Sequence, residues 1–306
     1  MELSSIQHIV PEKLTDFQPD LFIVTLSHET RSTNIAQQME GIPCRKVALC
    51  LQNQVKEYNY QDNLNYFREK GFEFIDVDDD VRIMDLILKD GTIEELKTTI
   101  DCTSMPQQWY YQIFSWFAEE DHLSSSQIRL IYTMASYVDE GSPVKVKKVK
   151  DFLKVKNNSK ERERALILGL GQEPNVSEMI CKIVKPDLLY LFYADPPAEK
   201  HFVEKVFVNN HAVINETHIR NLISYPILNG QTIYQTLIDV ILPLRNEYAI
   251  TIIPQGPKIF SLASMLLQIG YPDTVLSYPV FKRAHVGDRL PCGAPVVMDI
   301  LFEEEE

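Results

Sequence analysis

The sequence predicts an α/β protein with two tandem halves, each built around a parallel sheet and related to the other by internal duplication. Short apolar runs alternate with helical segments, which is typical of parallel sheets covered on both faces. Segments of the first part of the chain also match segments of the second part in the same order. We therefore expect two Rossmann-like halves over residues 1–140 and 163–306, joined by a basic linker or hairpin over residues 141–162.

The first matched pair is an apolar strand, a polar loop and an amphipathic helix. Residues 21–39 (LFIVTLSHETRSTNIAQQM) align without a gap on residues 165–183 (ALILGLGQEPNVSEMICKI). A second buried strand follows in each half, KVALCL against DLLYLFY. After a helix we expect a short third strand, at residues 72–77 in the first half and at residues 205–208 in the second.

The later matches complete the pattern. Residues 98–118 match residues 249–270 in the order strand, Gly or Ser turn, proline and helix. The strand IRLIYT of the first half then matches TVLSYP of the second. The sequence PVVMDILFEEEE at the end of the chain predicts one more strand and an acidic terminus.

Composition and charge restrict the class of function. With 45% hydrophobic and 24% charged residues, the 306-residue chain resembles an ordinary globular protein. It shows no basic region followed by an apolar run at the N-terminus and no long apolar stretch, so we expect a cytoplasmic protein without a membrane span. Five cysteines without CxxC spacing favour reduced thiols. A net charge of −13 disfavours broad binding to nucleic acid.

The positive charge is concentrated in one segment. Nine of the thirty Lys and Arg residues lie between Lys145 and Arg164. This pattern is typical of a solvated linker or an exposed hairpin. The alternative interpretation is a contact surface for a nucleic acid or an acidic partner.

The loops after the strands are the predicted ligand site, because ligands of parallel sheets bind outside the carboxyl ends of the strands. They combine small and hydrogen-bonding residues that suit a phosphate, a ribose or a base edge. The candidates in the first half are Ser27, His28, Glu29, Arg31, Ser32, Asp101, Thr103 and Ser104. Those in the second half are Gly171, Gln172, Asn175, Gln255, Gly256, Pro257 and Lys258.

Helix capping is the alternative for the hydroxyl and amide residues of these loops. Arg31 and Lys258 do not fit that alternative, because a positive charge at a helix N-terminus opposes the helix dipole and a bound anion would relieve the mismatch. His28 and Glu29 could form a base and its orienting group, although no nucleophile is identifiable. The seven histidines lack metal-ligand spacing, and no GxGxxG or GxxxxGK[ST] is present, so we predict no metal and no cofactor.

The second half, with GLGQEPNVSEMICKIVKPDLLYLFYADP, IIPQGPKIFSLASMLLQIG and DTVLSY, resembles CARF-type sensor domains. In that family a turn of Gly-Thr-Lys type after the fourth strand contacts a cyclic oligonucleotide. Gly256, Pro257 and Lys258 match this turn with Pro in place of Thr, and DCTSMPQ looks like a degenerate version in the first half. Two such halves in one chain resemble SAVED domains, the sensors of prokaryotic antiphage defence. The resemblance implies a nucleotide ligand and a partner effector protein.

Three functions follow as hypotheses. The leading one is a sensor that binds a phosphorylated or cyclic nucleotide and signals through a partner. The second is a nucleotide-processing enzyme, a hydrolase or ring nuclease, on the same scaffold. The third is a protein-interaction component of a defence complex, docked through its basic segment.

Overall fold

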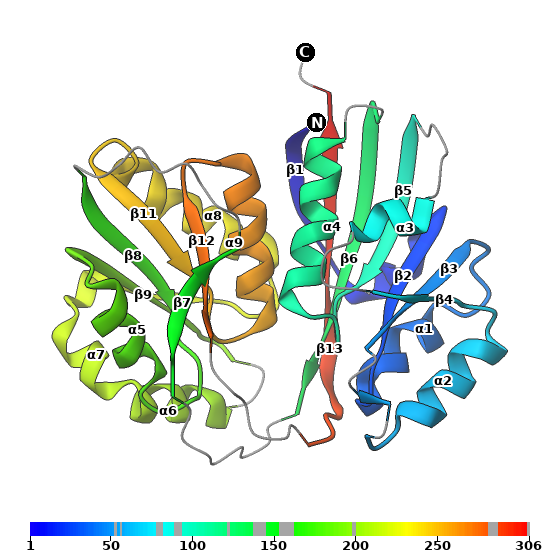
Figure 1. Cartoon of the computed structure of the whole chain (residues 1–306), viewed down its shortest axis with the longest axis horizontal. Helices are drawn as coiled ribbons and strands as arrows, with labels where there is room; N and C mark the ends of the chain where they lie inside the picture. Colours follow the sequence, from blue (N-terminus) through cyan, green and yellow to red (C-terminus); the bar gives the residue numbers. More distant parts are fainter. Residues whose placement is uncertain are drawn as a thin grey trace. The chain divides into compact units, whose positions relative to one another are not determined.

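The chain forms two compact units, which a computed structural model describes over residues 1–51, 54–55, 57–77, 82–88, 94–120, 123–136, 145–152, 162–197, 200–280 and 287–304. The first unit contains Met1–Ser136 together with Gly287–Glu306. The second contains Tyr137–Val286. Both chain termini therefore lie in the first unit (Figure 1).

The first unit has a seven-stranded sheet in the order β1-β13-β6-β5-β2-β3-β4. Its strands are β1 (Glu2–Ile9), β2 (Leu21–Leu26), β3 (Arg45–Cys50), β4 (Glu73–Asp76), β5 (Glu95–Asp101), β6 (Ser125–Ala135) and β13 (Pro291–Glu303). Its helices are η1 (Pro11–Asp16), η2 (Thr30–Thr33), α1 (Asn34–Gln38), α2 (Tyr60–Glu69), α3 (Ile83–Leu88) and α4 (Gln107–Glu119). Strands β2 to β6 pair in parallel, whereas β13 and β1 add antiparallel strands beyond β6.

The second unit has a six-stranded sheet in the order β10-β9-β8-β11-β12-β7. Its strands are β7 (Lys148–Asp151), β8 (Glu163–Gly169), β9 (Leu188–Ala194), β10 (Leu222–Tyr225), β11 (Tyr248–Ile253) and β12 (Val275–Val280). Its helices are α5 (Val176–Val184), α6 (Lys200–Asn209), α7 (His211–Glu216), η4 (Ile219–Asn221), α8 (Gly230–Leu244) and α9 (Lys258–Gly270). Among the described strands of this sheet, β8 to β12 pair in parallel and β7 pairs antiparallel with β12.

The parallel strands follow the same order in both sheets. Numbered along the chain within each unit, the order is third, second, first, fourth, fifth: β4-β3-β2-β5-β6 in the first unit and β10-β9-β8-β11-β12 in the second. This is the Rossmann-like arrangement, so the predicted α/β class is confirmed. The origin of the two units by duplication stays a prediction.

The boundary between the halves differs from the expected one. Residues 291–303, which we assigned to the second half, form β13 of the first sheet, between β1 and β6. Both edges of β13 are thus paired, and Val297, Ile300 and Phe302 are buried. The apolar pattern of residues 291–303 predicts a strand. It does not predict which sheet the strand joins, because its pairing partners lie far away in the sequence.

Two further segments also differ from expectation. Residues 205–208, expected as the third strand of the second half, lie in α6, and the third strand is β10. A run of three apolar residues, here 206–208, does not distinguish a strand from a turn of helix. Within the basic segment, residues 148–151 form the edge strand β7 of the second sheet, and residues 153–161 lie outside the described part of the chain.

Each unit has its own apolar core around its sheet. Phe22, Val24 and Phe67 belong to the core of the first unit, and Leu166, Leu168 and Ile180 to that of the second. Within the described residues, no helix has the length and apolar character needed to cross a membrane.

Candidate functional site

Each sheet has one point where the direction of strand order reverses, between the first and fourth parallel strands. In the first unit it lies between β2 and β5, and in the second between β8 and β11. In sheets of this kind ligands usually bind in a crevice between the loops that leave these two strands at their carboxyl ends, so we call these loops the crevice loops. The predicted site residues fall on these four loops.

In the first unit the loop after β2 contains a buried ion pair that also contacts the loop after β5. The Arg31 guanidinium donates to the Glu29 carboxylate, with Nε 2.9 Å from Oε2, and their side chains are only 6% and 11% exposed. Ser104, from the loop after β5, donates its hydroxyl to the same oxygen at 2.9 Å. Arg31 also donates to the carbonyl of Thr133 at 2.7 Å. The loop after β2 is thereby tied to β5 and β6.

The anion beside Arg31 is therefore a side chain of the protein itself. Burial disfavours the charged guanidinium, but Tyr132 and the Glu29 carboxylate outweigh burial and raise the pKa of Arg31. The predicted mismatch between Arg31 and a helix dipole is absent, because Arg31 lies in the four-residue turn η2 and pairs with Glu29. An external anion is not required at this position.

The predicted hydroxyl residues of the first unit hold loops together and do not cap helices. The Ser27 hydroxyl accepts from the Glu29 N–H at 3.2 Å, and Ser32 donates to the Thr25 carbonyl at 2.7 Å. The N-cap of α4 is Pro106, and no side chain caps that helix.

Asp101 and Thr103 fix the start of the loop after β5. The Asp101 carboxylate accepts from the Thr103 N–H at 2.9 Å. The Thr103 hydroxyl accepts from the Thr133 N–H at 3.0 Å. Both side chains are buried, so this loop is held on the neighbouring strand β6.

His28 and Glu29 do not form the predicted base and orienting pair. The Nδ1 of His28 lies 2.8 Å from the Gln54 side-chain oxygen, which also accepts from the His28 N–H. Gln54, and not Glu29, is thus the partner of the His28 ring, and the buried Nε2 has no hydrogen-bond partner. Glu29 is engaged with Arg31, so this geometry weakens the enzyme hypothesis.

Sequence reasoning missed the segment that completes this crevice. The Asp288 carboxylate accepts from the Thr30 N–H at 2.8 Å and from its hydroxyl at 2.6 Å. Asn59 donates to the same carboxylate at 3.1 Å. The Arg289 guanidinium lies 3.6 Å from Glu29. No local pattern could have indicated these contacts, because they join residues more than 200 positions apart in the chain.

In the second unit, glycines let the two crevice loops meet backbone to backbone. A Cβ on Gly169 would lie 2.3 Å from the Gln255 carbonyl oxygen. A Cβ on Gly256 would lie 2.5 Å from the Leu170 carbonyl oxygen, and Gly256 also has a φ of +92°. Position 256 has no room for a Cβ and requires a positive φ, and only glycine meets both requirements.

Two asparagines that we did not predict hold the loop after β8. Asn210 donates to the Gly171 carbonyl at 2.9 Å and accepts from the Ser177 hydroxyl at 2.6 Å. Asn209 donates to the Gln172 carbonyl. Asn175 is the residue before α5, with a left-handed φ of 63° and no side-chain cap. The Asn175 side chain therefore makes no capping hydrogen bond to α5, just as the hydroxyl residues of the first unit do not cap helices.

The loop after β11 leads directly into a long helix. Lys258 is the first residue of α9, Pro257 precedes it, and no side chain caps the helix. The Ser261 hydroxyl of the first turn donates to the Pro254 carbonyl at 3.1 Å, which holds the loop on the helix. Gln255 is buried between the two loops. Backbone N–H groups of the first helical turn and the Lys258 charge thus share one end of α9.

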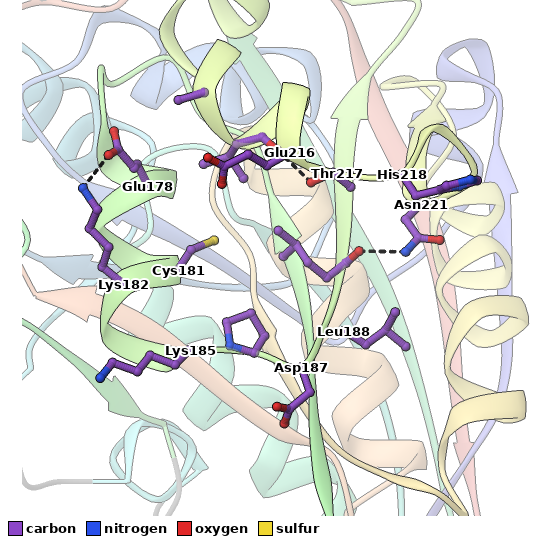
Figure 2. Close-up of a pocket in the computed structure, with 14 residues that line it drawn as sticks. Glu178, Cys181, Lys182, Lys185, Asp187, Leu188, Glu216, Thr217, His218 and Asn221 are labelled. Atoms are coloured by element: carbon purple, nitrogen blue, oxygen red, sulfur yellow. Dashed lines mark hydrogen bonds and ion pairs between the residues drawn. The ribbon is translucent and has the colours of Figure 1, made fainter.

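A separate hollow lies at the opposite, amino end of β9 (Figure 2). Cys181, Glu216 and His218 line it together with the Glu178–Lys182 ion pair. Burial, with Glu216 and Glu178 nearby, raises the pKa of Cys181 to about 11. The thiol is therefore protonated at neutral pH and unsuited to act as a nucleophile.

The described residues contain no cluster of three or more His, Cys, Asp or Glu side chains that could hold a metal ion. Compared with known proteins, the chain matches no protein-family model, and no curated protein is significantly similar to it. Fold and loops together define a two-unit α/β protein with Rossmann-like strand order and a different set of loop contacts in each unit. The resemblance to CARF and SAVED sensors stays a prediction.

Proposed function

We propose that the protein is a nucleotide-binding sensor whose ligand, a phosphorylated or cyclic nucleotide, binds at the crevice of the second unit. One observation carries this proposal: the backbone N–H groups of the first turn of α9 and the Lys258 charge lie together at the end of the loop after β11. This arrangement suits a phosphate.

Specific features of the second crevice support a ligand of this class. Gly169 and Gly256 let the loops after β8 and β11 approach backbone to backbone, which fixes the loop after β8 beside the residues that lead into α9. Gln172, which is half-buried in the loop after β8, provides an amide group that suits a base edge or a ribose. The partner effector and the role in antiphage defence rest on the family resemblance alone.

The test is calorimetric titration of the full-length protein with a panel of cyclic mononucleotides and cyclic oligonucleotides. Wild type is expected to bind at least one member more tightly than about 100 μM, and Lys258→Ala to weaken that binding about tenfold or more. Lys182→Ala, which removes another lysine of the same unit, is the matched control and retains affinity. No binding by any member of the panel contradicts the proposal, and turnover of a bound nucleotide favours the enzyme hypothesis.

A further inference from the structure

We propose that the outer edge of β7 is a docking strand for an extended acidic segment of a partner protein, which adds to the second sheet in β conformation. The inference goes beyond the proposed nucleotide site, because it concerns a different strand and different residues. It assigns a surface through which a partner can contact the second unit.

The register of β7 shows which of its backbone groups point outward. The Phe152 N–H donates to the Leu276 carbonyl at 2.9 Å, and Lys150 lies opposite Tyr278 in the same register. Hydrogen-bonded pairs alternate along an antiparallel ladder, so the backbone groups of Val149 and Asp151 point away from β12. Pro279, which has no N–H, lies opposite Val149, in agreement with this assignment.

The outward groups lie at the end of the sheet. The strand order ends at β7, so among the described residues no strand pairs with its outer edge (Figure 1). Val149 packs its side chain against the core of the second unit, which holds the strand in place. A fixed edge strand with unpaired N–H and C=O groups is a template for an added strand.

The charge of this strand selects the chemistry of the partner. Lys145, Lys147, Lys148 and Lys150 are all exposed, and across the described part of the chain none has an ion-pair partner. They stand out in a protein with a net charge of −13. Carboxylates on an added strand would lie beside these ammonium groups.

Lysines on edge strands also have a protective role, since they discourage pairing with other sheets. The two roles are compatible, because the same lysines reject an apolar strand and admit an acidic one. Nucleic acid would use the charge alone. The outward backbone groups of Val149 and Asp151 favour a polypeptide.

The test measures binding of an eight-residue synthetic peptide of alternating Glu and Val to the full-length protein by fluorescence anisotropy. A variant with the four lysines changed to Ser is expected to bind at least about tenfold more weakly than wild type. The matched control changes Lys13, Lys97, Lys182 and Lys185 to Ser, which alters net charge equally and leaves affinity unchanged. Changing the four edge lysines to Arg restores binding, and thermal melts verify that each variant is folded.

A second probe separates strand addition from simple charge attraction. The same peptide, N-methylated on alternate residues, keeps its charge but loses one edge of backbone hydrogen bonds, so we expect it to bind at least about tenfold more weakly. Equal binding of the methylated peptide, or an equal affinity for an eight-nucleotide single-stranded DNA, overturns the proposal. So does a lack of binding, or unchanged binding by the Ser variant. Lys258→Ala should leave peptide binding unchanged, so failure of this proposal and failure of the nucleotide proposal are distinguishable.

Discussion

At the scale of single residues, the buried cation of the first unit meets a partner within the protein. Arg31 meets a carboxylate that is two residues away in the chain, and the pair is buried. A buried ion pair adds little net stability when intact but is costly to break, because removing one partner leaves the other charge uncompensated. Through the Ser104 hydroxyl and the Thr133 carbonyl, the Glu29–Arg31 pair fixes the loop after β2 against the loop after β5 and against β6.

Replacement of Glu29 tests this role. Glu29→Gln is expected to lower the free energy of unfolding by about 3 kcal/mol, since the Arg31 guanidinium stays buried without its counter-charge. Urea unfolding followed by circular dichroism measures the change. Glu40→Gln, which breaks the exposed pair with Lys70, is the control and should have little effect. An equal effect of both substitutions would show that the Glu29 pair has no special structural role.

Asp288 gives a prediction with a pH dependence. Burial raises the pKa of Asp288, but hydrogen bonds from Thr30, together with the Arg289 N–H and Asn59, outweigh burial and lower it. A lowered folded-state pKa stabilises the fold above the ordinary pKa of Asp, about 3.9, and this stability is lost as pH falls through the folded-state pKa.

Asp288→Asn is accordingly expected to be less stable than wild type at pH 7. The difference should shrink as the pH falls below about 4. Thermal melts between pH 3 and pH 7 measure both proteins. A difference that stays constant over this range would mean that ionisation of Asp288 does not contribute to stability.

At the scale of elements, the sequence predicted the alternation of strands and helices and the four loops of the site. It placed β2, β3, β5, β8, β9 and β11 close to their observed positions, because their apolar runs are bounded by polar loops. It mistook part of α6 for a strand, since a four-residue segment with three apolar residues carries too little periodicity. Asn59, Asn210 and Asp288 could not be predicted as site residues, because their partners are distant in sequence.

The contact between the loops of the second unit gives a prediction at this scale. Gly256→Ala places a methyl group 2.5 Å from the Leu170 carbonyl oxygen in a left-handed conformation, so it should cost about 2–4 kcal/mol of stability and weaken nucleotide binding. Gly41→Ala is the control, because Gly41 has a φ of +88° but nothing within 4 Å of the added methyl group. It should cost about 1 kcal/mol. Equal costs in chemical unfolding would rule out a tight contact between the loops.

At the scale of the whole molecule, the first unit is completed by the end of the chain. Strand β13 lies between β1 and β6, and Arg129 on β6 donates to Asp299 on β13 at 2.8 and 2.7 Å. The first unit is therefore discontinuous in sequence, with the second unit inserted between its parts. Its folding depends on both parts of the chain.

Deletion of residues 287–306 should unfold the first unit, because β1 then has no strand to pair with and β6 loses its antiparallel neighbour. The second unit, Tyr137–Val286, should persist as a protease-resistant fragment. Limited proteolysis with mass spectrometry measures both results. Deletion of residues 304–306 alone is the control. A first unit that resists proteolysis without β13 would contradict this interpretation.

Native mass spectrometry tests the central claim, nucleotide binding at the second crevice, most directly. The purified wild-type protein is compared with Lys258→Ala and Lys182→Ala, and any bound molecule is then extracted under denaturing conditions and identified. The proposed function predicts a co-purified nucleotide in wild type and Lys182→Ala that is lost in Lys258→Ala. A nucleotide that remains in Lys258→Ala, or is lost equally in Lys182→Ala, would contradict the assignment of the site to the start of α9.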